Sequence, residues 1–212
     1  NDYQKDFLLI GGFIRQCQIL IPIELNKICF DYYHQHTIQL YMDPESATNP
    51  HAYLIMPYFK GMDLFEFIDH DDYFHTVKVP KILCIFGKIL EKLYDLHYNK
   101  CILHGDVKPE SIIILDGENV LNGTTDEIKV EFVGFGYAES LDDLSSDDAF
   151  LRSKGHFGTE GYMAPELLKE FKYNRKADVF SAGVTLYNMV TECCLFPKGY
   201  LYHEISEFEY YK

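Results

Sequence analysis

The residues of this chain that could take part in chemistry are most concentrated between positions 103 and 111. Four side chains of different chemical type fall in this segment: His104, Asp106, Lys108 and Ser111. Imidazole, carboxylate and ammonium groups transfer protons and neutralise negative charge when a fold brings them together. The apolar run at residues 112–115 follows directly and predicts a strand at the end of the segment.

This segment resembles the catalytic loop of eukaryotic protein kinases, whose pattern reads H-R-D-x-K-x-x-N. The resemblance implies that Asp106 accepts the proton of the substrate hydroxyl and that Lys108 steadies the transferred phosphoryl group. Gly105 stands where the family has Arg, and Ser111 stands where it has a magnesium-binding Asn. The loop therefore predicts a kinase-like site whose charge-handling groups have changed.

A second departure concerns the metal. Gly134-Phe135-Gly136 stands where the family has D-F-G, whose Asp holds Mg²⁺ together with the Asn of the catalytic loop. Mg²⁺ prefers near-octahedral oxygen ligands, usually including a carboxylate. Gly134 has no side chain, and Ser111 offers one neutral hydroxyl. We therefore expect no metal site, with Ser111 and Gly134 as its degenerate positions. Each lost electrostatic group would slow phosphoryl transfer roughly 10²–10³-fold.

Residues 57–61 resemble the kinase hinge, which binds adenine through its backbone. The resemblance makes Met56 the gatekeeper and gives Pro57, which lacks an N–H, a position that needs only a C=O group. Phe59 keeps both groups, and Ile113 matches the residue beneath adenine. Asp63 matches an acid that faces the ribose or a basic substrate residue, although a plain helix N-cap would look the same. The implied cofactor is ATP.

Two downstream segments also resemble the family. Residues 158–166 match the pattern G-T-x-x-Y-x-A-P-E, in which the Thr, here Thr159, bonds the catalytic Asp and Lys. Thr159 together with Lys108 favours the Ser/Thr branch of the family. The residues at 161–166 most resemble those of calcium/calmodulin-dependent kinases. Residues 178–187 resemble the buried helix of the catalytic lobe. Asp178 at its start would hold the catalytic-loop backbone or act as an ordinary N-cap.

The elements that must position these residues can also be predicted. Residues 37–41 and 52–56 predict two antiparallel strands joined by a polar turn. Pro80 opens an amphipathic helix that reaches about residue 99. A turn is expected at residues 116–119, and a strand at 128–133.

Residues 1–36 are the least similar to the family. They predict a short strand and a helix from Pro22, but no Gly-rich phosphate loop and no V-A-I-K lysine strand. Glu24 could stand in for the Glu that pairs with that lysine. The alternative, an exposed Glu near the start of a packing helix, has more support because the lysine partner is missing.

Composition sets broad limits on the protein. The chain has 212 residues, of which 47% are apolar, and a formal charge of −14, which argues against nucleic acid or an anionic membrane as the main partner. The six cysteines have no C-x-x-C spacing and predict buried free thiols. With no signal peptide and no long apolar run, we expect a cytoplasmic or nuclear protein. The first residue is not Met, so we expect a piece of a longer chain.

Together these features predict an α+β, protein-kinase-like fold, mostly the helical C-lobe with a reduced N-terminal β portion. We divide the chain into a strand–helix segment of unassigned origin at 1–36 and a partial kinase-like domain at 37–212. The second part lacks the Gly-rich loop and the last C-lobe helices. Two functions remain open. One is an ATP-binding Ser/Thr kinase-like domain that acts on a protein with impaired phosphoryl transfer. The other is a pseudokinase scaffold that binds a protein partner without catalysis.

Overall fold

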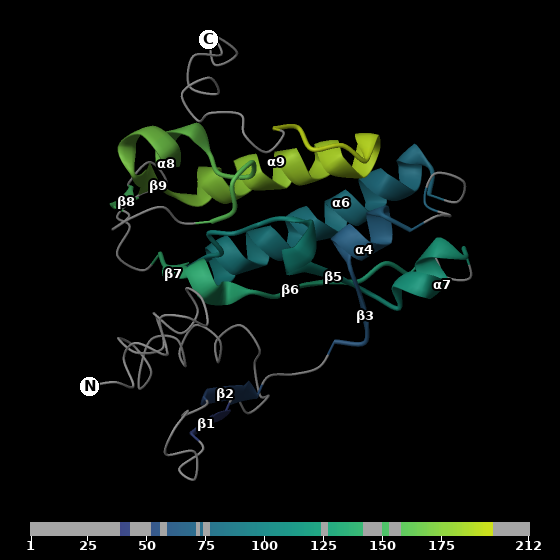
Figure 1. The fold of residues 1–212 in the computed structure, drawn as a ribbon, viewed down its shortest axis with the longest axis horizontal. Helices are drawn as coiled ribbons and strands as arrows, with labels where there is room; N and C mark the ends of the chain where they lie inside the picture. Colours follow the sequence, from purple (N-terminus) through teal and green to yellow (C-terminus); the bar gives the residue numbers. More distant parts are fainter. Residues whose placement is uncertain are drawn as a thin grey trace.

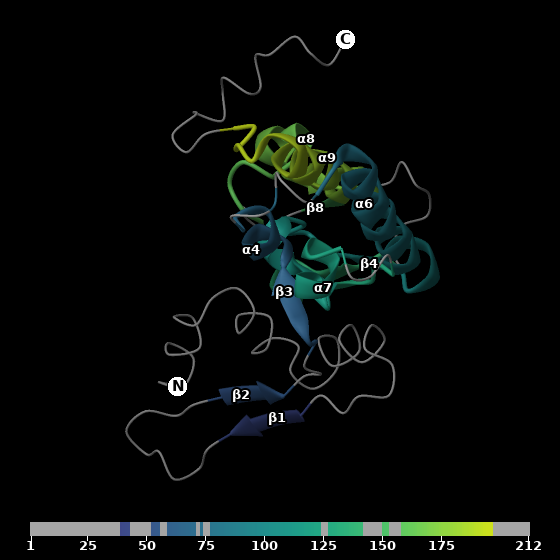
Figure 2. The ribbon, with the colours of Figure 1, turned by 90° about the vertical axis from the view of Figure 1, so that its right-hand side faces the viewer.

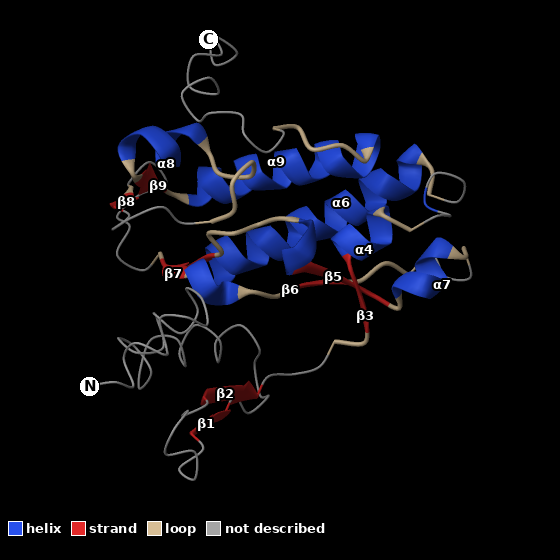
Figure 3. Cartoon of the chain, in the orientation of Figure 1, coloured by secondary structure: helices blue, strands red, loops and turns tan. Residues whose placement is uncertain are grey.

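Two long helices and a small sheet form the main body of the protein. The computed structural model describes residues 39–42, 52–55, 59–70, 73, 77–123, 127–141, 150–152 and 158–196. Helices α6 (Val79–Tyr94) and α9 (Arg175–Thr191) lie side by side, and short antiparallel strands lie below α6 (Figures 1 and 3). The expected α+β kinase-like architecture, dominated by helices, is confirmed.

The predicted N-terminal hairpin is present. Strands β1 (Gln39–Met42) and β2 (Ala52–Ile55) pair antiparallel, with Leu40 opposite Leu54 (Figure 2). The structure thus confirms both the pairing and its direction within the described residues of the two predicted strands. The expectations for residues 1–36, including Pro22 and Glu24, lie outside the described residues.

A three-stranded antiparallel sheet carries the candidate site. Its order is β3-β5-β6, with β3 (Gly61–Asp63), β5 (Ile112–Leu115) and β6 (Val130–Phe132). A Cβ atom at Gly61 would overlap the carbonyl oxygen of Ile114, so the close approach of β3 to β5 requires a glycine. Helix α4 (Leu64–Ile68) follows β3 immediately, because Asp63 caps it: Oδ1 accepts the N–H of Glu66 at 2.8 Å.

Helix α6 joins the sheet to the second long helix. Pro80 lies in its first turn, as predicted, and a buried stripe faces the core: Ile82, Ile85, Ile89 and Leu93. The helix contacts β6 and continues into a π-helical turn, Asp95–Asn99. The predicted helix to about residue 99 is therefore confirmed, but its last turn is wider than an α-helix.

Helix α9 is buried on one face only. Its buried residues include Ala182, Thr185 and Met189, whereas Val179 is 53% exposed and Val190 is 47% exposed. The resemblance predicted a buried helix at residues 178–187, and among the described residues one face of α9 is covered. Among the described helices, none has the length and apolar content that crossing a membrane would need.

Two local expectations from the sequence are wrong. Residues 116–119 do not form a simple turn: Asp116 adopts a left-handed conformation (φ 51°), and helix α7 (Gly117–Leu121) begins after it. Burial of Val120 and Leu121 explains this helix, because a helical turn places both apolar side chains against the core.

The expectation of buried thiols also fails for the described cysteines. Cys84, Cys193 and Cys194 are exposed, and Cys101 is half-buried. Cys84 lies on the polar side of α6, and Cys193 and Cys194 follow the end of α9, so a neighbouring apolar residue in the sequence did not imply burial. All four thiols are free.

Short ladders hold the segments that flank the catalytic loop. Strand β4 (Ile102–Leu103) pairs with β7 (Glu139–Ser140), and β8 (Leu151–Arg152) pairs with β9 (Lys172–Tyr173). Helix α8 (Pro165–Glu170) lies between β8 and β9 in the chain. The β4–β7 ladder places the start of the catalytic loop beside the segment that follows the Gly-Phe-Gly triplet.

Candidate active site

The backbone of the catalytic loop is hydrogen-bonded to a buried carboxylate on α9. Asp178 Oδ2 accepts the backbone N–H of His104 at 2.8 Å, and Oδ1 accepts that of Gly105 at 2.9 Å. The Nε2 atom of His97 lies 2.8 Å from Oδ2. Burial alone would raise the pKa of Asp178, but the hydrogen bond and charge of His97 outweigh it and leave this pKa below its usual value. Asp178 therefore fixes the loop, and the plain N-cap alternative is wrong, because Asn174 caps α9 by accepting the N–H of Lys176.

Asp106, Lys108 and Thr159 meet at one point. The Nζ atom of Lys108 donates to Thr159 Oγ1 at 2.6 Å and lies 3.2 Å from Asp106 Oδ2. Thr159 belongs to the segment that precedes α8, 51 residues after Lys108 in the chain. The structure thus brings all three predicted catalytic residues together, with Lys108 as the link between the other two.

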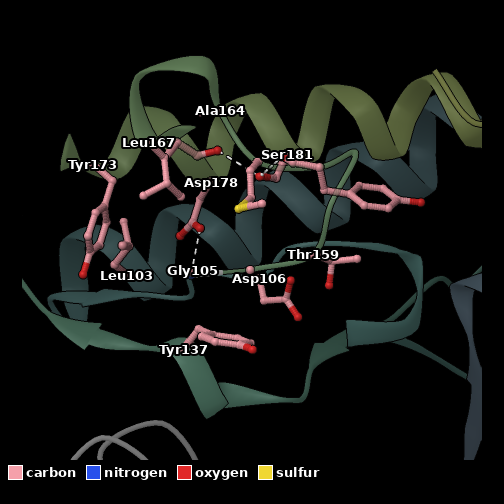
Figure 4. A pocket seen from close by; sticks show the side chains of 14 residues that line it. Leu103, Gly105, Asp106, Tyr137, Thr159, Ala164, Leu167, Tyr173, Asp178 and Ser181 are labelled. Carbon is pink, nitrogen blue, oxygen red and sulfur yellow. Dashed lines mark hydrogen bonds between the residues drawn. The ribbon is translucent and has the colours of Figure 1, made fainter. Parts of the chain in front are cut away.

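The carboxylate of Asp106 is largely buried but only partly hydrogen-bonded. Its side chain is only 10% exposed, and Oδ1 has no hydrogen-bond partner among the described residues. Asp106 lines a small cavity together with Thr159 and Tyr137, and the close-up shows the carboxylate between them (Figure 4). A buried acceptor without a donor is costly, so Asp106 Oδ1 is an energetically unfavourable group that the rest of the fold must offset.

Glycines allow the segments around Asp106 to approach closely. Gly105 has φ +77°, and a Cβ atom there would overlap the carbonyl oxygen of Tyr137. Gly158 has φ +94°, and its Cβ would lie 2.9 Å from the carbonyl oxygen of Gly105. Positive φ combined with such short Cβ contacts is tolerated by glycine and strains a residue that carries a Cβ. The Gly that replaces the family's Arg is therefore a packing position in this chain.

The two degenerate metal positions are neighbours in space but supply no ligands. A Cβ at Gly134 would lie 3.9 Å from the Cβ of Ser111. The Ser111 hydroxyl, however, donates to the carbonyl of Lys108 at 2.9 Å and accepts its N–H at 3.0 Å. With no carboxylate at 134 and the hydroxyl already bonded at 111, the donor set does not fit Mg²⁺. No cluster of three or more metal-ligating side chains occurs in the described part of the chain.

Aromatic rings pack against His104 of the catalytic loop. The His104 ring lies 4.9 Å from the ring of Phe135 and 5.2 Å from that of Phe132, centroid to centroid. Its Nε2 atom lies 3.0 Å from the carbonyl oxygen of Val133. Burial lowers the pKa of His104, so the ring stays neutral and packs as part of the core.

Only some of the residues predicted to bind the nucleotide lie in the described part of the chain. Met56 and Pro57 lie outside the described residues. Asp63 and Ile113 are directly opposite each other in the β3–β5 ladder, and Phe59 packs against the core just before β3. One Asp63 oxygen serves as the helix cap, which supports the N-cap reading of this residue without testing the other.

Residues that the sequence did not single out position the segment after Thr159. The Tyr162 hydroxyl donates to Asn188 Oδ1 at 2.9 Å, and the Ser181 hydroxyl donates to the Tyr162 carbonyl at 2.7 Å. Burial raises the pKa of Tyr162, so its proton stays available for this bond. Asn188 lies beyond the recognised part of the α9 motif, and no spacing signal marked it.

The chain is similar in sequence to known proteins along most of its length. A family profile described as "Protein kinase domain" matches residues 22–211. Over 189 residues the chain is 30% identical to "Inhibitor of nuclear factor kappa-B kinase subunit beta" of Mus musculus, covering 84% of this chain and 23% of that protein.

Two further relatives carry Ser/Thr kinase names. "Probable serine/threonine-protein kinase 2" of Plasmodium falciparum is 30% identical over 84% of this chain and 30% of its own length. "Serine/threonine-protein kinase unc-51" of Caenorhabditis elegans is 26% identical over 80% of this chain and 18% of its own length. The chain thus spans less than a third of the length of these relatives.

Proposed function

The chain belongs to the protein kinase family, and on that premise we propose a Ser/Thr kinase-like domain that binds ATP at the hinge but transfers phosphate poorly. Its partner is a protein, presented as a hydroxyl-bearing segment to Asp106. The proposed roles are proton acceptor for Asp106, phosphoryl clamp for Lys108 and loop contact for Thr159. These roles rest on the family resemblance and on the distances between the three side chains.

One observation carries the proposal: the proton-handling half of the site is assembled while the metal-handling half has no ligands. Asp106 and Lys108 lie 3.2 Å apart, and Asp106 Oδ1 lacks a donor in the described structure. Gly134 supplies no carboxylate, and the Ser111 hydroxyl is already bonded to the Lys108 backbone. Phosphoryl transfer depends on neutralising the charge of the phosphates, so a site of this kind supports binding better than turnover.

ATP binding is the finer part of the proposal. The position of Ile113 supports it. Ile113 lies opposite Asp63 in the β3–β5 ladder, and Asp63 directly precedes α4, so the residues expected at the adenine and at the ribose are neighbours. Phe59 and Ile113 would contact the adenine, with Met56 and Pro57 completing the hinge, and Asp63 would face the ribose with its uncapped oxygen. ATP would bring the transferable phosphate to the side of the sheet on which Lys108 lies.

Thermal unfolding with ATP, with and without Mg²⁺, tests this proposal. A ligand at 100 times its Kd stabilises the folded state by about 2.7 kcal/mol. We expect ATP to raise Tm equally in excess EDTA and in Mg²⁺, because the protein adds no ligands to the metal. A shift that appears only with Mg²⁺, together with phosphate transfer to a generic protein substrate, would contradict the proposed impairment. No shift under either condition would contradict ATP binding.

The second candidate function is a protein-binding scaffold without nucleotide. The lack of metal ligands at Ser111 and Gly134 favours it equally, and the exposed apolar residues Val179 and Val190 on α9 give it a surface. The same thermal experiment separates the candidates. A scaffold would show no ATP-dependent shift, while an ATP-binding domain would show one that Lys108→Ala reduces.

A further inference from the structure

Ser111 makes an unusual number of hydrogen bonds to a single neighbour. Its hydroxyl donates to the Lys108 carbonyl at 2.9 Å and accepts the Lys108 N–H at 3.0 Å. Its own backbone N–H also donates to the Lys108 carbonyl at 3.0 Å. The side chain is buried, so water does not compete for these bonds.

The other end of Ser111 is fixed to the sheet. Its carbonyl accepts the N–H of Val133 at 2.9 Å, beside the ladder that pairs β5 with β6. Ser111 therefore connects the Lys108 backbone to the strand that precedes Gly134. Its hydroxyl proton and one lone pair are used inside the protein, which leaves a weaker donor for any metal ion.

Lys108 is consequently held at both ends. Ser111 holds its backbone N–H and C=O, while Thr159 and Asp106 hold its Nζ atom at 2.6 and 3.2 Å. A lysine side chain has a long flexible stem and loses much conformational entropy when it is fixed. Fixing the Lys108 backbone restricts the positions that its ammonium group can reach. The lysine side chain therefore loses less conformational entropy when it binds a phosphate.

We infer that Ser111 is a positioning residue for Lys108: at the family's metal-binding position, this chain uses the hydroxyl to close the catalytic loop and aim the lysine at an anionic phosphate. The inference extends the proposed function by giving the phosphate contact to a positioned lysine, independent of a metal ion. Its effect on ATP rests on that proposed function, whereas its effect on the loop does not.

The test compares three variants. Ser111→Ala removes the hydroxyl, and Ser111→Thr keeps one. Thr185→Val is the matched control, because it removes another buried hydroxyl, which donates to the Ser181 carbonyl at 3.0 Å and does not contact Lys108. Each variant is measured for amide hydrogen exchange at Lys108 and for ATP affinity in excess EDTA.

We expect Ser111→Ala to speed exchange at the Lys108 amide on the order of fivefold relative to the control, since one hydrogen bond is lost. Metal-free ATP affinity should fall by a similar factor. Ser111→Thr should restore both values, and Thr185→Val should change neither selectively.

Unchanged Lys108 exchange in Ser111→Ala would overturn the inference. So would a Mg²⁺-dependent stabilisation of the native protein that Ser111→Ala abolishes, because the hydroxyl would then be a metal ligand. If no variant binds ATP, the proposed function fails, and the exchange data still decide the role of Ser111.

Discussion

The carboxylate of Asp178 lies 2.8 Å from Nε2 of His97, and both side chains are almost completely buried. The same carboxylate accepts the N–H groups of His104 and Gly105. Helix α9 thereby holds the π-helical end of α6 and the catalytic loop through one side chain. The position of Asp106 depends on a residue 72 positions later in the sequence.

Removing this carboxylate should destabilise the protein strongly. Asp178→Ala leaves the N–H groups of His104 and Gly105 without an acceptor and His97 without its partner. Breaking a buried pair in this way costs about 3–5 kcal/mol. Urea unfolding followed by circular dichroism measures the loss. A change below about 1 kcal/mol, as for an exposed ion pair, would show that Asp178 does not anchor the loop.

Asp178 should also contribute to acid sensitivity. Its pKa in the folded protein lies below its usual value of about 3.9. A lowered folded-state pKa stabilises the fold above about pH 4 and loses that contribution as the pH falls through the folded value. The free energy of unfolding of the native protein should therefore fall more steeply below pH 4 than that of Asp178→Asn. Equal slopes for the two proteins would contradict this assignment.

Two glycines should respond in opposite directions to the same substitution. Gly105→Ala forces a Cβ into a left-handed conformation and against the Tyr137 carbonyl, so it should cost about 1–3 kcal/mol. Gly87→Ala, in the middle of α6 with open space around its Cβ, should raise stability by about 0.5–1 kcal/mol.

Thermal melts of the two alanine variants beside the native protein decide this. A Gly105→Ala protein as stable as Gly87→Ala would mean that Tyr137 shifts freely. The close packing of the catalytic loop on the segment after the Gly-Phe-Gly triplet would then have no energetic role.

The parts of this protein that the sequence predicted are those encoded by local patterns. The hairpin at β1 and β2 follows from apolar segments around a polar turn, and α6 follows from apolar spacing after Pro80. The motif residues Asp106, Lys108 and Thr159 were found by their order along the chain. From the family resemblance we expected Thr159 to bond both Asp106 and Lys108. The structure brings the three together, but Lys108 is the residue that contacts the other two.

The parts that the sequence did not predict depend on contacts between distant segments. Ser111 was identified as a poor metal ligand, but its hydrogen bonds to Lys108 follow from the backbone of a short 3₁₀ turn at Pro109–Ser111. Asn188 holds Tyr162 across the face of α9, which no spacing rule indicates. The exposed cysteines show the same limit, because an apolar neighbour in sequence does not determine which side of a helix is covered.

Restoring the two metal positions should create metal affinity. Gly134 has a left-handed backbone, which Asp tolerates better than most residues, and its Cβ would lie 3.9 Å from that of Ser111. We expect Gly134→Asp combined with Ser111→Asn to bind Mn²⁺ in the presence of ATP at least about tenfold more tightly, since even second-shell changes alter metal affinity about 10–100-fold. Electron paramagnetic resonance of Mn²⁺ measures this.

Gly134→Ala combined with Ser111→Asn is the control for the metal experiment. It carries the same backbone strain without the carboxylate, so its Mn²⁺ affinity should stay near that of the native protein. Equal gains in both double variants would show that the carboxylate at 134 is not what the native site lacks.

The rate of phosphate transfer from Mg²⁺-ATP to a generic protein substrate tests the central claim most directly. The native protein is compared with Asp106→Asn, which removes the proton acceptor. We predict that the two rates lie within about one order of magnitude, because the missing metal ligands limit transfer whether or not Asp106 is intact. A native rate more than roughly 10²-fold above that of Asp106→Asn would show that the site is catalytically competent and would contradict the account.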